Sequence, residues 1–384
     1  MPKKIWYAPN KFEAYGEEEI KAVESCLRDG WLAPGPRTAE FEEKVSAFFG
    51  KKYGVFVNSG SSANLCGLAA LEFKPGDEII TPACTFSTVL APVEQLGLKA
   101  VFCDVEEGRY VPSVDQILAC VTDKTVCCFI PNLVGSKPDW AELKKRLPRK
   151  DIVLFEDSCD TMTHTPESDV AAISFYASHV ITAGGTGGMV MFNDEKLKKK
   201  ALMFRDWGRI GDNSEQVSDR FNHDIDGIKY DWKFLYGVKG YNFKACEMNA
   251  AFGLVQLSKL DKFQKIRREN IDRFVQNLKK GGTELVLPKD HEKFDWLCLP
   301  LMSKNRLSLL NHLEANDVQT RVCMAGNITR HPAYRHYLKE FPESDRVMAE
   351  GFMLGAHHGL TPEDVDRVCG LILEWEKDQK KGGS

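Results

Sequence analysis

Short apolar runs alternate with helical stretches between about residues 50 and 195. The runs that predict β-strands lie at residues 55–57, 78–81, 100–103, 126–130, 152–155, 172–175 and 189–192. Several are apolar throughout, which is typical of strands covered by helices on both faces. Helical patterns at residues 61–73 and 140–147 lie between some of these strands. The alternation predicts a mostly parallel sheet with helices on both sides.

A longer helical pattern covers residues 246–280, and the chain changes character after it. Its apolar positions recur at near-helical spacing, at Phe252, Val255, Leu260, Phe263 and Ile266. Beyond it, residues 297–301 favour a strand, and residues 307–315 and 363–375 favour helices. We therefore predict an α/β fold of two domains. The large domain covers 1–255 and includes the N-terminal segment, and a smaller C-terminal domain covers 256–384.

Composition and charge narrow the class of protein. The chain has 384 residues, of which 43% are hydrophobic and 28% charged, as expected of a globular protein. The net charge of −4 gives no reason to expect a nucleic-acid partner. No apolar run approaches the ~20 residues that cross a membrane, and no apolar stretch follows the N-terminal lysines. We therefore expect a cytoplasmic protein with no membrane partner.

Cysteine spacing argues against metal or disulfide chemistry. The chain has 12 cysteines but no CxxC motif, and several have apolar or small neighbours. Buried thiols in a reducing compartment explain this pattern better than metal ligands or disulfides. The sequence therefore predicts no metal site.

Three local motifs have candidate chemistry, and each has a structural alternative. The turn Asn58-Ser59-Gly60-Ser61 follows a strand and opens a helix, so it suits a phosphate group or a simple helix cap. Asp157 ends an apolar strand, where it could hold a protonated pyridine nitrogen or cap a following helix. His179 follows another strand, and an isolated histidine there is more often structural than catalytic.

The order of the motifs along the chain changes this balance. The segments SGSSANL, GDEIITPACTFST, EDSCD, SFYASH, RDWGR and GYNFKACEMNAAFGLVQL resemble the DegT/DnrJ/EryC1/StrS sugar aminotransferase family. The resemblance covers residues from about 20 to 340. It implies the pyridoxal-phosphate-dependent aminotransferase fold (fold type I), with a large domain built on a mostly parallel seven-stranded sheet.

One position departs from the family in an informative way. In the family, a lysine five residues after the serine of an SFxxxK run bonds covalently to pyridoxal phosphate. Here that position is His179, and no lysine lies between Lys150 and Lys196. The substitution resembles the branch of nucleotide-sugar 3-dehydratases. Imidazole forms no stable covalent bond to the cofactor aldehyde but is a good acid or base near neutral pH.

The resemblance therefore implies a lyase that binds its cofactor non-covalently. With pyridoxamine phosphate, it would remove the C3 hydroxyl from a nucleotide-linked 4-keto-6-deoxyhexose, and His179 would be the base. Further roles follow by position. Gly60, Ser61 and Ser174 would hold the phosphate, Phe86 would stack on the ring and Asp157 would pair with its nitrogen. Asp160 would lie near the cofactor, and Asn242 would reach in from the other subunit of a homodimer. The candidates for contacts with the nucleotide-sugar are Arg321, Asn327 and Arg330.

Other departures leave the substrate and two alternatives open. Some relatives carry an iron–sulfur cluster, but residues 210–220 contain no cysteine. We therefore expect no such cluster, and regeneration of pyridoxamine phosphate by an amino donor such as glutamate. The turn at 184–188 lacks the family's glutamate, and the loop at 161–169 is short. The alternatives are an aminotransferase-like enzyme with a non-covalent cofactor and a non-catalytic relative that binds the cofactor or a nucleotide-sugar.

Overall fold

A seven-stranded sheet forms the centre of the N-terminal part in the computed structural model, which describes residues 3–10, 13–211 and 216–382. The strand order is β1-β7-β6-β5-β4-β2-β3. The strands are β1 (Tyr53–Val57), β2 (Glu78–Pro82), β3 (Lys99–Cys103), β4 (Thr125–Pro131), β5 (Val153–Asp157), β6 (Val170–Ser174) and β7 (Gly188–Phe192). All seven predicted strands are confirmed, and their ends differ from the prediction by at most two residues.

The sheet is mostly parallel, as predicted. Strand β7 runs antiparallel to its neighbours β1 and β6, whereas the pairs from β6 through β3 are parallel. The carboxyl ends of β4, β5 and β6 therefore meet at one edge. The helices of this part are α1 (Glu17–Arg28), α2 (Pro36–Phe48), α3 (Gly60–Ala70), α4 (Ser87–Gln95), α5 (Val114–Leu118), α6 (Trp140–Arg146), α7 (Glu195–Arg205) and α8 (Val217–Arg220).

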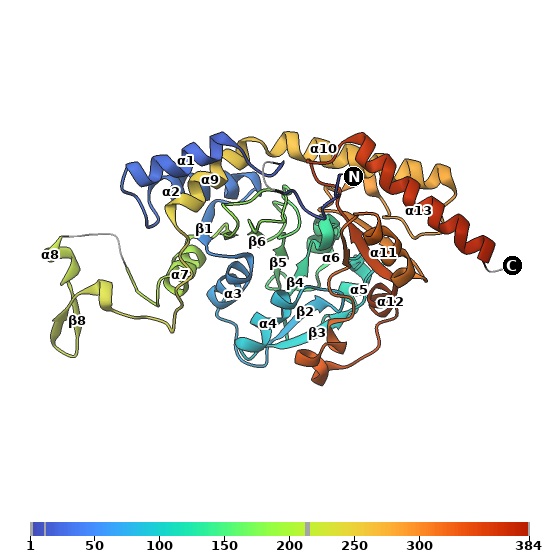
Figure 1. Cartoon of the computed structure of the whole chain (residues 1–384). Coiled ribbons are helices and arrows are strands. Elements are labelled where there is room, and N and C mark those ends of the chain that lie inside the picture. Colours follow the sequence, from blue (N-terminus) through green and yellow to red (C-terminus); the bar gives the residue numbers. More distant parts are fainter. Residues whose placement is uncertain (1–2, 11–12, 212–215, 383–384) are drawn as a thin grey trace.

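The C-terminal part is built on a three-stranded antiparallel sheet of order β10-β12-β11. Its strands are β10 (Leu299–Met302), β11 (Thr320–Val322) and β12 (Gly351–Leu354). Its helices, together with the two that lead into it, are α9 (Glu247–Ser258), α10 (Leu260–Gly281), α11 (Arg306–Ala315), α12 (Pro342–Glu350) and α13 (Pro362–Gly382). Helices α10 and α13 pack side by side along one edge of the molecule (Figure 1).

The prediction of one continuous helix over residues 246–280 is wrong, because the helical segment is broken near its middle. The structure contains two helices, α9 and α10, that meet at Lys259, where φ is −99° and ψ is −3°. The Lys259 side chain turns back to contact the buried Glu19 carboxylate over 2.7 Å. The apolar spacing continues across this break, so the hydrophobic pattern alone does not locate it.

The hydrophobic core joins the two parts. The cluster that fills the C-terminal part also contains Ile5, Val105 and Val134 from the N-terminal part. The predicted division at residue 256 therefore passes through a continuous core, and it stays a prediction.

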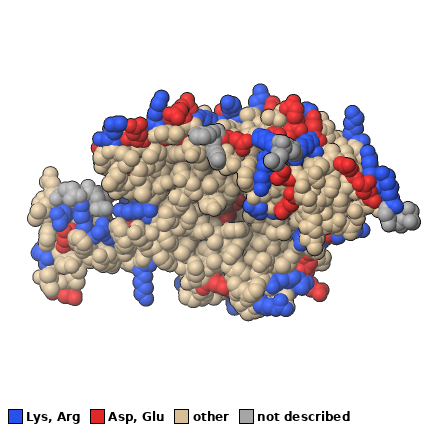
Figure 2. Space-filling view, viewed as in Figure 1, with Lys and Arg blue, Asp and Glu red and all other residues tan. Residues whose placement is uncertain are grey.

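A hairpin of β8 (His223–Ile225) and β9 (Ile228–Tyr230) projects from the body beside α8 (Figure 1). Residues 212–215, part of the stretch without cysteines, lie outside the described residues. Charged side chains lie around the rim of the face in Figure 2, and the broad centre has few. Within the described ranges, no helix is long and apolar enough to cross a membrane.

All 12 cysteines are free thiols. The prediction of buried thiols is confirmed for nine of them. It is wrong for Cys246, which is exposed because it stands at the N-cap of α9.

Candidate active site

A cavity of about 510 Å³ opens at the carboxyl ends of β4, β5 and β6. This is the edge of a parallel sheet at which α/β proteins bind ligands. Eight of the residues to which the sequence assigned a role in the site lie in its wall. They are Gly60, Ser61, Phe86, Asp157, Asp160, Ser174, His179 and Arg321.

The turn before α3 forms one end of this cavity. The Ser59 side chain accepts a 3.1 Å hydrogen bond from the Ser62 N–H, so the helix-cap interpretation is confirmed for Ser59. Gly60 and Ser61 line the cavity at the positive end of the helix dipole. A Cβ at Gly60 would lie 2.6 Å from the Ser174 Cβ, so only glycine allows this close approach. The turn therefore has the shape and polarity that suit a phosphate group.

The turn at residues 184–188, which lacks the family's glutamate, packs behind the phosphate turn. The Thr186 hydroxyl donates a 2.6 Å hydrogen bond to the Asn58 carbonyl oxygen. A Cβ at Gly188 would lie 2.3 Å from the Ser59 carbonyl carbon. Threonine therefore supports the start of α3 through one hydrogen bond, and glycine allows the two backbones to touch.

Asp157 is buried at the end of β5. Its carboxylate accepts a 2.8 Å hydrogen bond from the Asn64 amide and a 2.9 Å hydrogen bond from the Cys159 N–H. No helix begins in the described residues directly after it, so the helix-cap alternative is wrong. Burial raises the pKa of Asp157, so a cation such as a protonated pyridine nitrogen would stabilise its charged form.

His179 and Asp160 face each other across the cavity wall. His179 Nδ1 lies 3.8 Å from Asp160 Oδ1, just beyond hydrogen-bond range. The other carboxyl oxygen, Oδ2, accepts a 2.8 Å bond from the Val134 N–H. Burial, together with the nearby Arg267 guanidinium, lowers the pKa of His179 to about 4. Burial also raises the pKa of Asp160 to about 7, so the pair is uncharged between these values.

The remaining features fit a flat aromatic cofactor with a phosphate. Phe86 lines the cavity with 46% of its surface exposed, so its ring face is free to stack. No lysine stands among the described residues that line the cavity. Gly60 and Ser174 could therefore hold a phosphate, Asp157 a ring nitrogen and Phe86 a ring face.

Asn242 does not line this cavity. It is exposed and forms an isolated β-bridge with Asp206 near the base of the projecting hairpin. Its expected role in the site of a second subunit stays a prediction.

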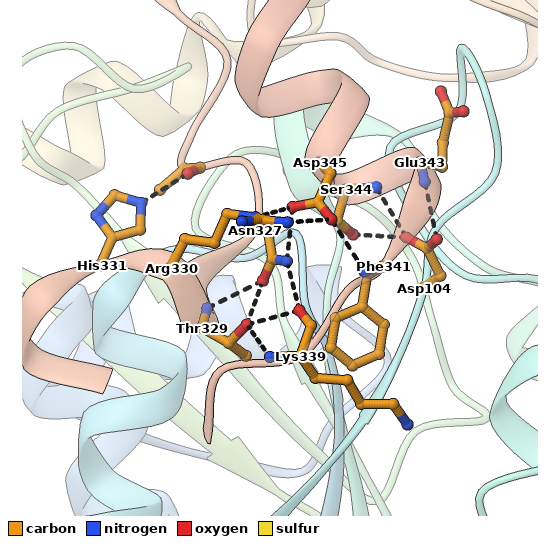
Figure 3. A network of polar contacts seen from close by, with 11 residues as sticks. Asp104, Asn327, Thr329, Arg330, His331, Lys339, Phe341, Glu343, Ser344 and Asp345 are labelled. Atoms are coloured by element: carbon orange, nitrogen blue, oxygen red, sulfur yellow. Dashed lines mark hydrogen bonds and ion pairs between the residues drawn. The ribbon is translucent and has the colours of Figure 1, made fainter. Parts of the chain in front are cut away.

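The structure does not bring Asn327 and Arg330 to the cavity. The Asn327 amide donates to the Lys339 carbonyl over 2.9 Å and to Asp345 over 2.8 Å, and its oxygen accepts from Thr329 (Figure 3). Arg330 pairs with the same Asp345 carboxylate through Nε and Nη2. These contacts join the turn after residue 326 to the start of α12, so both side chains have a structural role here.

Replacing Asn327 with alanine is expected to lower the free energy of unfolding by about 1–3 kcal/mol, because this buried side chain loses its hydrogen bonds to Thr329, Lys339 and Asp345. Denaturant unfolding measures this loss. The KM for a nucleotide-sugar is expected to stay unchanged, since Asn327 does not line the cavity. A raised KM at unchanged stability would contradict this assignment.

Several wall residues were not singled out in the sequence. Asn132 follows β4, lines the cavity and donates to Glu156 over 3.1 Å. A polar residue after an apolar strand was a usable signal for it. Tyr176 and Ser178 lie within the SFYASH motif and line the cavity beside His179. Tyr7 also lines it, but no local pattern indicates this.

The comparisons with known proteins agree with this geometry. A sequence profile of the DegT/DnrJ/EryC1/StrS aminotransferase family matches residues 13–373. The chain belongs to this family. Its relatives include the lipopolysaccharide biosynthesis protein RfbH of Salmonella typhimurium, which is 34% identical over 96% of this chain and 91% of RfbH. A dTDP-4-dehydro-2,6-dideoxy-D-glucose 3-dehydratase of Saccharopolyspora spinosa is 32% identical over 94% of this chain and 84% of that protein.

A solved structure gives the same picture of the fold. The E. coli GDP-4-keto-6-deoxy-D-mannose-3-dehydratase with bound hydrated PLP superposes with a TM-score of 0.85 at 26% identity. The match covers 96% of this chain and 100% of that chain. The predicted aminotransferase fold is therefore confirmed, and the family is one of pyridoxal-phosphate-dependent enzymes of sugar biosynthesis.

Proposed function

We propose that the protein is a 3-dehydratase of a nucleotide-linked 4-keto-6-deoxyhexose that binds pyridoxal or pyridoxamine phosphate without a covalent bond. The observation that carries this proposal is His179 in the cavity wall, at the position of the family's lysine. Its imidazole is neutral above about pH 4 and is therefore a base under physiological conditions. Relatives that are themselves 3-dehydratases support the assignment.

Each residue of the site has a place in this function. Pyridoxamine phosphate, when bound, would supply an amine group and a ring that can accept electrons. Gly60, Ser61 and Ser174 hold the phosphate end, and Phe86 covers one face of the ring. Asp157 keeps the ring nitrogen protonated through its buried carboxylate. His179 takes a proton from the carbon next to the ring, and Asp160 orients the imidazole.

The partners follow from the same reasoning. Arg321 lines the cavity with an exposed side chain and suits the diphosphate of a nucleotide-sugar. Glutamate is the proposed amino donor, and no iron–sulfur cluster is needed. Asn242, exposed near the projecting hairpin, reaches the cavity of a second subunit in a homodimer.

An aminotransferase-like enzyme with a non-covalent cofactor is the second candidate, and kinship with sugar aminotransferases favours it. Without the lysine, the return of the amine to the sugar lacks its usual covalent catalyst. A non-catalytic relative is a third candidate. The buried Asp157 argues against it, because its carboxyl has two hydrogen bonds but no cationic partner among the described residues, and a bound pyridine nitrogen would supply one.

An absorbance titration with pyridoxal phosphate and then L-glutamate tests the proposal. We expect a bound aldehyde spectrum that borohydride does not fix to the protein, and conversion to the amine form with glutamate. Incubation with a 4-keto-6-deoxy nucleotide-sugar is then expected to yield the 3-deoxy product. A 4-amino sugar as the main product would favour the second candidate. No cofactor binding would leave the non-catalytic relative.

A further inference from the structure

The N-terminal segment, residues 3–10, pairs with the C-terminal part of the chain. The carbonyl oxygen of buried Ile5 accepts a 2.9 Å hydrogen bond from the Gln319 N–H. The Gln319 side-chain oxygen in turn accepts a 3.0 Å hydrogen bond from the Tyr7 N–H. His357 Nε2 lies 3.1 Å from the Trp6 carbonyl oxygen. The backbone of three consecutive residues is therefore fixed by partners more than 300 positions away in the sequence.

The His357 ring is held in one tautomer. The Gly359 N–H donates to Nδ1 over 3.2 Å, so the ring proton is on Nε2 and points at the Trp6 carbonyl. Burial lowers the pKa of His357 to about 3, so the ring stays neutral near neutral pH. The N-terminal segment is thus anchored by neutral hydrogen bonds that persist under physiological conditions.

This anchoring directs the Tyr7 side chain into the active-site cavity, which it lines with His179 and Asp160. The Arg321 guanidinium lies 5.6 Å from the centre of its ring. Its phenol hydroxyl has a hydrogen bond with the buried Cys298 thiol, a weak partner that a sugar oxygen would replace. Burial raises the pKa of Tyr7 well above its usual value, so the hydroxyl keeps its proton and remains a hydrogen-bond donor.

We propose that Tyr7 binds the substrate: its hydroxyl donates a hydrogen bond to an oxygen of the hexose, and its ring supports Arg321 beside the nucleotide diphosphate. This inference rests on the proposed function, which takes the substrate to be a nucleotide-linked sugar. A hexose presents hydroxyl and carbonyl oxygens that need donors. Leu297 and Met353, which share this cavity, supply apolar contact only.

Two substitutions separate the hydroxyl from the ring. Tyr7→Phe removes the donor and keeps the aromatic face under Arg321. Tyr7→Ala removes both, so the Arg321 guanidinium keeps only its 2.7 Å hydrogen bond to the Thr320 carbonyl and loses the aromatic face. Trp6→Phe is the matched control, because Trp6 lies on the same anchored segment but does not line the cavity. Equal thermal unfolding of the variants shows that the segment stays in place.

The test is calorimetric titration of the protein loaded with pyridoxamine phosphate. The probes are GDP-mannose and dTDP-glucose, each compared with GDP or dTDP alone. For Tyr7→Phe we expect roughly 3–10-fold weaker binding of the nucleotide-sugar that the parent prefers, the usual effect of one hydrogen bond. Binding of the bare nucleotide stays unchanged. Tyr7→Ala weakens both, and Trp6→Phe weakens neither.

The outcomes distinguish this inference from the proposed function. Unchanged nucleotide-sugar binding by Tyr7→Phe overturns the hydrogen bond to the hexose, as does an equal loss for sugar-linked and bare nucleotides. The proposed role of Tyr7 is also overturned if the parent protein binds neither nucleotide-sugar. If the Tyr7 pattern is found but a 4-keto-6-deoxy sugar is not dehydrated, the proposed reaction fails while the substrate contact stands.

Discussion

Replacing His179 with asparagine is expected to lower the turnover of 3-dehydration by a factor on the order of 10²–10⁴, the usual contribution of a positioned acid–base group. The amide cannot take up a proton. The turn that carries it should persist, because the residue 179 N–H donates its 3.0 Å bond to the Tyr176 carbonyl whatever the side chain. Affinity for pyridoxal phosphate should stay nearly unchanged, since Gly60, Phe86 and Asp157 are untouched.

Single-turnover kinetics of the variant loaded with pyridoxamine phosphate measure the loss. His164→Asn is the control. His164 is exposed, and its ring has a hydrogen-bond contact with the Phe48 carbonyl, outside the cavity. A His179→Asn protein that dehydrates as fast as the parent would remove His179 from the reaction. His179→Lys should instead capture pyridoxal phosphate covalently, so that borohydride fixes it, and should lose dehydration.

The sheet was predictable because its strands are buried on both faces. Runs such as 126–130 and 152–155 are apolar throughout, and each becomes a strand within two residues of the prediction. The polar residue that follows such a run then lies at the edge where α/β proteins bind ligands. This local rule places Asp157 in the cavity, and it also applies to Asn132, which was overlooked. His179 was predicted from the family resemblance instead, because it lies five residues after the end of its strand.

Contacts between segments that are distant along the chain could not be predicted from the sequence. Tyr7 reaches the cavity only because Ile5 pairs with Gln319, and nothing near residue 7 indicates that partner. Asn327 and Arg330 lie in a segment that resembles the family, but a motif does not say which way a side chain points. Both turn to Asp345, a residue of α12. The resemblance to the family therefore did not predict which residues the side chains of Asn327 and Arg330 contact.

The charge state of the site likewise depends on packing. Burial raises the pKa of both Asp160 and Glu156 to about 7, although the two carboxyls belong to one short motif with Asp157. Only Asp160 faces His179. Glu156 instead accepts hydrogen bonds from Asn132 and Ser168 on the far side of the strand end. The same motif thus contains two groups that titrate near neutral pH, of which one touches the imidazole.

The Asp160 proton decides which imidazole nitrogen is the base. Because Oδ2 accepts the Val134 N–H, we expect the proton of the neutral acid on Oδ1, from which it would be donated to His179 Nδ1 once ligand binding closes the 3.8 Å gap. The imidazole proton is then on Nε2, which cannot act as the base. Above about pH 7 the charged Asp160 carboxylate would instead accept a hydrogen bond from the Nδ1–H across the same gap, which leaves Nε2 without a proton. We therefore expect kcat/KM to rise as pH increases through about 7.

Asp160→Asn is expected to abolish this rise. The asparagine oxygen accepts the Val134 N–H and its amide donates to His179 Nδ1, which fixes the inactive tautomer at every pH. At pH 8 the variant should be slower by a factor on the order of 10² or more, as when a histidine loses its orienting carboxylate. Near pH 6 the kcat/KM values of the parent and the variant should converge, because protonated Asp160 would donate to His179 Nδ1 as the asparagine amide does.

The pH profile of kcat/KM from 5.5 to 8.5 measures this difference, with Glu156→Gln as the matched control. Glu156 has a similarly raised pKa but makes no contact with His179, so its variant should keep the rise near pH 7. A constant ratio of parent to Asp160→Asn across this range would show that Asp160 supports the site without controlling its proton. Loss of the rise in Glu156→Gln alone would assign the titration to the other carboxyl.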